Sequence, residues 1–311
     1  MIIYKYLDTK GAKKTLENGA VLLRTPNEFN DPFDCYYHVD EKERQKATDL
    51  IVNYLFFLTL YKSVVVEGKK LFLGKANTSL LKQNLILLDR IIKKKKQYKF
   101  DKQIELFYWI SKKISNLSIE DIRNKISHKF DEVFEEIKER FLVSCFSLNN
   151  ESVLMWSHYA GSHKGACIKY EIDDNDFQKV NYSKNMPNFQ LTKALEITLG
   201  HDYSKEEVDI NNKDFFFMVD PILLKSEDWV YENEVRCVYS KGNLNQKINK
   251  ITDKKGKNIF LLNMPRPKAI YLGCKASKRF VNSIKKISGN VPIFKMEIVD
   301  NEYKVVPKEL D

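Results

Sequence analysis

One stretch decides how the fold is organised: Phe141-Leu142-Val143-Ser144-Cys145-Phe146-Ser147. It is short, compact and rich in apolar residues, which is typical of a strand buried on both faces. The chain before it, from about 41 to 141, carries apolar residues three and four apart, as in Ile122, Ile126 and Phe130. That spacing is typical of amphipathic helices. The stretch therefore marks the point where a helical block gives way to a strand-rich remainder.

Strand patterns occur on both sides of the helical block. Further strands are expected at 2–6, 21–24, 166–172, 179–182, 230–239, 269–272 and 293–298, and short helices at 15–18, 153–160 and 191–199. We expect an α+β fold, in which both chain ends form a mostly antiparallel sheet. Residues 1–40 and 142–311 are predicted to form one catalytic-type domain, and 41–141 a helical insertion.

Composition excludes several classes of protein. Apolar residues make up 43% of the 311, enough to bury a core, so global disorder is excluded. The longest apolar run, about 50–60, is too short to span a membrane, which takes roughly 20 residues. The N-terminus lacks a basic region followed by a long apolar stretch, the mark of a secretory signal. We therefore expect a cytoplasmic chain, with its five cysteines free.

The chain is basic, and its lysines cluster. It has 52 Lys and Arg against 42 Asp and Glu, a formal charge of +10. Runs such as Lys93–Lys96 and the segment 241–257 could contact the phosphates of a nucleic acid. A solvated, lysine-rich surface is the simpler interpretation, because aromatic residues are not interleaved in the second run.

The segment 225–239 carries the sharpest chemical signal. If it is a strand, Glu232, Glu234 and Arg236 share one face, opposite the face that carries Trp229, Tyr231, Val235, Cys237 and Tyr239. Two carboxylates about 7 Å apart can raise one another's pKa, and a guanidinium can hold one of them ionised. Such a pair supplies one acid and one anion. The alternative is a solvent-facing ladder of ion pairs, which contributes little to stability.

A second cluster lies at 155–165, at the end of a predicted helix. Trp156, His158, Tyr159 and His163 gather where the helix gives way to a strand. They suit a general acid or base, or an aromatic wall for a ring, whereas a histidine that caps the helix end is the structural alternative. The spacing of the two histidines across a glycine is not that of a helical zinc site.

The loop 29–34 is the third candidate. Its prolines and Asx residues favour a rigid turn, and we expect Phe29 and Phe33 to anchor the turn to a core. Asn30, Asp31 and Asp34 would then be presented to a ligand. A purely structural Asx turn explains the same pattern.

Taken in order, these motifs resemble one family. Tyr4-Lys5-Tyr6, the loop 29–34, Cys145-Phe146-Ser147, the segment 154–165 and the segment 225–236 look like the bacterial domain-of-unknown-function family 2971. The resemblance spans nearly the whole chain, apart from the helical block. Glu232-Asn233-Glu234 also resembles the paired glutamates of ADP-ribosyltransferases, with Tyr4 or Tyr6 at the early position. The chain departs from that pattern because it has no Ser-Thr-Ser strand and offers Lys5 where Arg or His is usual.

The second resemblance implies an enzyme that binds NAD and transfers or hydrolyses its ADP-ribose part, as a toxin or antiphage effector. A carboxylate would stabilise the cation that develops when the nicotinamide–ribose bond breaks. The implied catalytic residues are Glu234, Glu232 and His158. The implied NAD-binding residues are Tyr4, Tyr6, Arg24, Asn30, Asp31, Trp156, Tyr159, His163 and Arg236.

Two other functions remain open on the sequence alone. In a metal-dependent nuclease or phosphohydrolase, Asp31, Asp34, Glu232 and Glu234 would gather Mg²⁺ or Mn²⁺ while the basic surface holds nucleic acid. In a non-catalytic module that binds nucleic acid or a partner, Lys93–Lys96 would form the contact.

Overall fold

The computed structural model describes residues 1–61, 118–173, 176–200 and 220–310. Two compact units can be distinguished. The first comprises Met1–Tyr36, Ile137–Met186 and Asp220–Asp311, and the second comprises Tyr37–Glu136 and Pro187–Val219. The predicted basic run Lys93–Lys96 lies outside the described residues.

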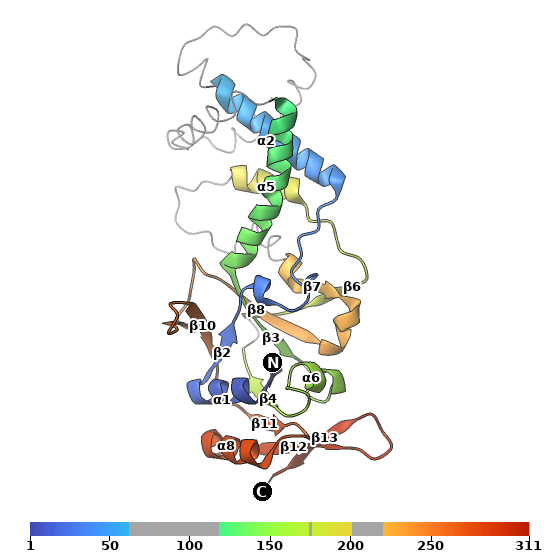
Figure 1. The fold of residues 1–311 in the computed structure, drawn as a ribbon, viewed down its shortest axis with the longest axis vertical. Coiled ribbons are helices and arrows are strands. Elements are labelled where there is room, and N and C mark those ends of the chain that lie inside the picture. The colour runs from blue at the N-terminus through green and yellow to red at the C-terminus, as the bar shows by residue number, and fades with distance from the viewer. Residues whose placement is uncertain (62–117, 174–175, 201–219, 311) are drawn as a thin grey trace. The chain divides into compact units, whose positions relative to one another are not determined.

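An eight-stranded sheet forms the first unit (Figure 1). Its strand order is β13-β12-β11-β4-β1-β3-β8-β5. The bounds are β1 Ile2–Leu7, β3 Phe141–Ser147, β4 Ala166–Glu171, β5 Phe177–Lys179, β8 Glu234–Ser240, β11 Ala269–Leu272, β12 Ile293–Ile298 and β13 Val305–Glu309. Strands from both ends of the chain lie next to one another, so the predicted α+β class with a mostly antiparallel sheet is confirmed.

One pair of neighbouring strands in this sheet is parallel. β11 and β12 run in the same direction, and the helix α8 (Lys278–Ser288) connects them, as a parallel crossover requires. Figure 1 shows α8 beside these two strands. Ser277 caps the helix, since its side chain accepts a hydrogen bond from the backbone N–H of Phe280.

Two smaller sheets and five short helical elements complete the unit. The small sheets are β2-β10-β9, with bounds Ala20–Leu23, Asn258–Asn263 and Ile248–Thr252, and β6-β7, with bounds Asn181–Ser183 and Leu224–Ser226. The helical elements are α1 (Thr9–Asn18), α6 (Val153–His158) and the 3₁₀ helices η1 (Pro26–Glu28) and η5 (Asp220–Leu223). A third 3₁₀ helix, η6 (Glu227–Glu232), leads into β8.

Apolar side chains pack in two clusters within this unit. The larger contains Ile3, Leu142, Val235 and Ile270, together with Phe280 and Ile284 of α8. The smaller contains Tyr6, Trp156, Cys167, Tyr271 and Met296, so α6 packs against it. Burial of this much apolar surface is the main stabilising contribution to the fold.

The second unit is helical where it is described. It contains α2 (Glu41–Tyr61), most of α5 (Ile119–Arg140) and α7 (Leu191–Gly200). Tyr37 stacks on Phe134 at 5.2 Å between ring centroids, and Phe189 meets both rings edge-on. No helix among the described segments has the length and apolar character needed to cross a bilayer.

Three local predictions were wrong. The strand expected at 179–182 is divided between β5 (Phe177–Lys179) and β6 (Asn181–Ser183), which belong to different sheets. The strand expected at 230–239 begins only at Glu234, because Ser226 caps a 3₁₀ helix at 227–232 and Asn233 ends it with φ 43°, a left-handed conformation. Phe33 does not anchor the loop 29–34, since its side chain is 61% exposed. The five cysteines are free, as predicted.

Candidate functional site

Five charged side chains are buried together in the first unit. They are Asp34, Lys225, Glu232, Glu234 and Arg236, and we call them the charged cluster. None of them is more than 8% exposed. Charged side chains are rarely buried to this extent unless they are paired. Their burial contradicts the alternative in which these glutamates form a solvent-facing ladder.

β8 and the turn before it bring the two glutamates together. Glu234 and Arg236 lie two residues apart on β8, so they share the face opposite Val235 and Cys237, as predicted. The left-handed turn at Asn233 returns Glu232 to the same region, and the Ser147 hydroxyl fixes it by donating to its backbone oxygen at 2.6 Å.

Arg236 holds the cluster from its fully buried position. Its guanidinium donates to Glu234 at 2.8 and 2.9 Å and to Asp34 at 2.8 Å twice. It also donates to the backbone oxygen of Ile222 at 2.6 Å, and its carbon lies 5.4 Å from the centre of the Phe29 ring. Paired hydrogen bonds of this kind are among the strongest that an arginine makes.

Lys225, on β7, links the three carboxylates. Its Nζ lies 2.6 Å from Glu232, 3.2 Å from Glu234 and 3.5 Å from Asp34. The ammonium also lies 5.0 Å from the centre of the Trp229 ring. Thus one lysine and one arginine face three carboxylates, and the cluster carries one more negative than positive charge when all its members are ionised.

The pKa values of the two glutamates are shifted in opposite directions. Burial alone would raise the pKa of Glu234, but Arg236 and Lys225 outweigh it and lower the pKa to about 2. The opposite holds for Glu232, where burial raises the pKa and Lys225 offsets this only in part. Tyr159 donates to Glu232 at 2.6 Å, and burial raises the pKa of that phenol, so it remains a donor. Glu232 is therefore the member of the pair that accepts a proton more readily.

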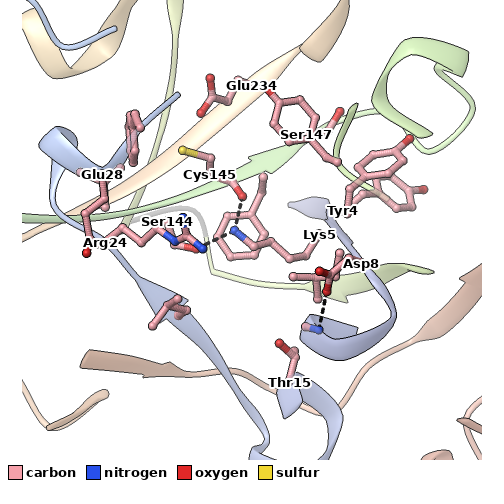
Figure 2. Close-up of a pocket in the computed structure, with 18 of the residues that line it drawn as sticks. Tyr4, Lys5, Asp8, Thr15, Arg24, Glu28, Ser144, Cys145, Ser147 and Glu234 are labelled. Carbon is pink, nitrogen blue, oxygen red and sulfur yellow. Dashed lines mark hydrogen bonds between the residues drawn. The ribbon is translucent and has the colours of Figure 1, made fainter. Parts of the chain in front are cut away.

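A cavity of about 770 Å³ adjoins the cluster and is lined by residues of β1, β2, β3 and α6 (Figure 2). β1 and β3 pair at Tyr4 and Ser147 alone. The residues that follow Tyr4 in β1 and residues that precede Ser147 in β3 line the cavity. Lys5 reaches across to β3, where its Nζ donates to the Ser144 hydroxyl at 2.9 Å and to the Cys145 backbone oxygen at 2.7 Å. A volume of this size lies within the range of small-molecule sites, roughly 300–1,000 Å³.

Eight of the twelve predicted site residues line this cavity. They are Tyr4, Tyr6, Arg24, Asn30, His158, Tyr159, Glu232 and Glu234. Tyr6 is largely buried, and its hydroxyl donates to the backbone oxygen of Asn149 at 2.9 Å. His158 is exposed and lies 6.2 Å from the ring of Tyr231. Segments far apart in the sequence thus meet at one hollow.

The other four predicted residues, Asp31, Trp156, His163 and Arg236, do not line the cavity. Trp156 is fully buried, its indole N–H donates to the backbone oxygen of Asn150, and its ring packs edge-on against Tyr6. His163 stacks near Trp156, at 6.5 Å between centroids. Asp31 accepts a hydrogen bond from the backbone N–H of Phe33 and so forms a local Asx turn. Of the four, Arg236 and Trp156 contact residues of the cavity wall, namely Glu234 and Tyr6.

Metal ligation has little support in the charged cluster. Among the described residues, no group of three or more His, Cys, Asp or Glu is placed to hold a metal ion. The carboxylates that could do so, Asp34, Glu232 and Glu234, already surround Lys225 and Arg236. Two buried cations in the same place compete with a divalent cation for these oxygens.

Part of the chain that contributes to the charged cluster matches a known sequence family. Residues 155–237 match a family model described as a protein of unknown function, DUF2971. This confirms the resemblance to that family. The DUF2971 segment supplies Tyr159, Lys225, Glu232, Glu234 and Arg236. It is shorter than the near-complete resemblance that the motifs predicted, since the loop 29–34 and the motif at 145–147 precede it. No curated protein and no solved structure was found to match the chain.

Sequence reasoning did not assign Lys225 or Lys5 to the site. Lys225 lies seven residues before Glu232 in the sequence. Because a 3₁₀ helix follows Lys225, neither strand nor α-helix periodicity predicts that the two side chains meet. Lys5 was visible as a lone charge in an apolar strand, which is a signal for a buried cation with a function.

Proposed function

We propose that this protein is an enzyme that acts on NAD, breaking the nicotinamide–ribose bond and passing the ADP-ribose part to water or another acceptor. The observation that carries the proposal concerns Glu232. This buried carboxylate lies at the wall of a cavity large enough for a nucleotide, and its neighbouring cation, Lys225, does not outweigh the effect of burial, so its pKa is raised. A carboxylate in a cleft whose pKa is perturbed by burial and by specific charged neighbours is a candidate for a functional group.

The chemistry needs a carboxylate near the reacting sugar. When the C1–N bond breaks, its electron pair leaves with nicotinamide, and the ribose is left with the character of an oxocarbenium cation. A nearby carboxylate stabilises that positive charge. Water or an acceptor hydroxyl then forms the new bond to C1 and gives up a proton, which a carboxylate of raised pKa can take.

Glu232 suits this role better than Glu234. Both oxygens of Glu234 accept from Arg236, and the lowered pKa keeps the group ionised but poorly basic. Glu232 accepts from Tyr159 and Lys225, one hydrogen bond to each oxygen. In our proposal Glu232 is the catalytic carboxylate, Glu234 and Arg236 hold the pair in place, and Lys225 orients both glutamates.

The cavity wall offers surfaces for a ring and for a sugar. Tyr4, Tyr159 and His158 contribute aromatic faces or edges, and Asn30 contributes an amide. Aromatic side chains with a few placed polar groups are typical of small-molecule sites. A role as a toxin or antiphage effector would follow from depletion of NAD or from modification of a target.

Incubation of the purified full chain with NAD tests the proposal. We expect release of free nicotinamide, measured by chromatography, and a fall of roughly 10²- to 10⁴-fold in the Glu232→Gln variant. Glu171→Gln is the matched control, because Glu171 is an exposed residue at the end of β4 and pairs with Lys268 at the surface. It should retain the wild-type rate.

Two results would overturn the proposal. One is no nicotinamide release with water or with any protein or nucleic-acid acceptor supplied. The other is nucleic-acid cleavage that EDTA stops, which would instead indicate a metal-dependent nuclease.

A further inference from the structure

Two cations converge on three consecutive residues of β3. Arg24 forms an antiparallel bridge with Val143, with backbone hydrogen bonds of 2.9 and 2.7 Å in the two directions. Lys5 donates to the next two residues, Ser144 and Cys145. Both cations line the cavity, and Figure 2 shows the Arg24 side chain extending along its wall toward Lys5. Lys5 and Arg24 therefore place two cationic side chains on the cavity wall beside β3.

Neither cation forms an ion pair with a carboxylate in the described part of the chain. The carboxylates that line the cavity have other partners. Asp8 caps α1 by accepting from the backbone N–H of Gly11, and Glu28 pairs with Lys257 at 2.6 Å. The remaining three belong to the charged cluster and are paired there. Glu234 attracts Lys5 without forming an ion pair with it, so both cations can still bind an anion from outside the chain.

Two like charges beside a cavity repel each other unless an anion lies between them. Burial lowers the pKa of Lys5, and Arg24 lowers it further, while Cys145, Cys237 and Glu234 offset this only in part. An anion bound between Lys5 and Arg24 would remove the repulsion. The hydroxyl of Ser144 accepts from Lys5, which leaves its own hydrogen available for a bound oxygen.

The distribution of charge along the cavity identifies the kind of anion. The cavity wall carries the cations Lys5 and Arg24 and also the carboxylates of Glu232 and Glu234. A ligand charged along its whole length would be repelled by the glutamates. A ligand with phosphates at one end and a neutral sugar at the other matches both kinds of side chain, and the guanidinium fork suits phosphate oxygens.

We propose that Lys5 and Arg24 bind the diphosphate of an adenosine-diphosphate ligand, with the Ser144 hydroxyl as a third donor. This deepens the proposed function, because it places the diphosphate of NAD beside Lys5 and Arg24 and its nicotinamide-bearing ribose toward Glu232. Binding of the phosphate portion can be measured without turnover, so the two claims can fail separately.

Isothermal titration of the purified full chain tests this. ADP-ribose, adenosine and inorganic pyrophosphate are titrated into wild type, Arg24→Gln and Lys5→Met. We expect ADP-ribose affinity to fall roughly ten- to a hundredfold in each variant, as loss of a charged hydrogen bond implies. Any adenosine binding should be the same in all three proteins. Arg279→Gln, an exposed arginine on α8 away from the cavity, is the matched control and should bind like wild type.

Arg24 is exposed, so its variant is expected to fold even if Lys5→Met does not. Equal ADP-ribose affinity in wild type and Arg24→Gln would overturn the inference, even if nicotinamide is released from NAD. Pyrophosphate binding as tight as that of ADP-ribose would show a free-phosphate site and would also overturn it. If Arg24→Gln loses affinity for ADP-ribose and the wild-type protein does not cleave NAD, the inference is supported and the proposed function is refuted.

Discussion

Replacing each glutamate of the charged cluster with glutamine should have very different consequences for stability. Glu234→Gln removes the carboxylate that accepts two of the Arg236 hydrogen bonds and leaves Asp34 as the only carboxylate paired with that buried guanidinium. Loss of one partner of a buried ion pair costs about 3–5 kcal/mol. Glu232→Gln instead removes the surplus negative charge, so three carboxylates facing two cations become two facing two.

The two variants can be compared by thermal unfolding at pH 7. For domains of 150–250 residues, 1 kcal/mol shifts Tm by about 2–4 °C, so Glu234→Gln should lower Tm by about 6–20 °C. Glu232→Gln should change Tm by no more than about 4 °C, because Lys225 keeps Glu234 and Asp34 as partners. The exposed control Glu171→Gln should not change Tm measurably. If Glu232→Gln lowered Tm as much as Glu234→Gln, the charge balance inferred for the cluster would be wrong.

Three more predictions concern the same unit. The pKa of Glu234 is lowered to about 2 from 4.5, so its stabilising effect is present above pH 4.5 and is lost as pH falls toward 2; denaturant unfolding should show this loss, and Glu234→Gln should reduce it. Glu232 has a raised pKa, so it favours the folded state below pH 4.5 and loses that effect as pH rises through its folded pKa; a stability curve of Glu232→Gln that matches wild type across this range would contradict the assignment. Tyr159→Phe removes the 2.6 Å hydrogen bond to Glu232 and should lower nicotinamide release about tenfold with the fold intact by circular dichroism; an unchanged rate would exclude Tyr159 from the site. Gly165→Ala should destabilise by roughly 3 kcal/mol or prevent folding, because a Cβ there lies 2.1 Å from the last backbone oxygen of β1, whereas Gly242→Ala, whose Cβ has only an ordinary contact at 3.6 Å, should be tolerated; equal expression and Tm of the two would refute this packing.

The large sheet was predictable where local patterns agree with burial. The apolar run at 141–147 is a strand buried on both sides of the sheet, and the strands expected at 269–272 and 293–298 have the predicted bounds. The hairpin β9–β10 was missed, although only β9 is largely exposed and polar and the apolar run at 259–262 in β10 was a visible strand signal. Helix α8 could have been found from Ser277 as a cap, followed by Phe280 and Ile284 four residues apart.

The site was predictable in its chemistry but not in its contacts. The Glu232, Glu234 and Arg236 spacing indicated a carboxylate pair beside a guanidinium, and the three residues do meet. The bond that decides the charge balance joins Arg236 to Asp34, which is 202 residues away, and no local period encodes such a contact. The 3₁₀ helix before β8 was missed because alternation over 229–239 imitates a strand, although Ser226 was a visible cap.

The central claim is that Glu232, at the cavity wall, accepts a proton more readily than Glu234, which stays ionised as an anchor. Carbon-13 NMR titration of the side-chain carboxyl groups measures this most directly, with signals assigned by the two glutamine variants. Our account predicts that the pKa of Glu232 lies above 4.5 and that of Glu234 near 2. If both carboxyl groups titrated below 4.5, or if Glu234 titrated above Glu232, the division of roles between the two glutamates would be contradicted.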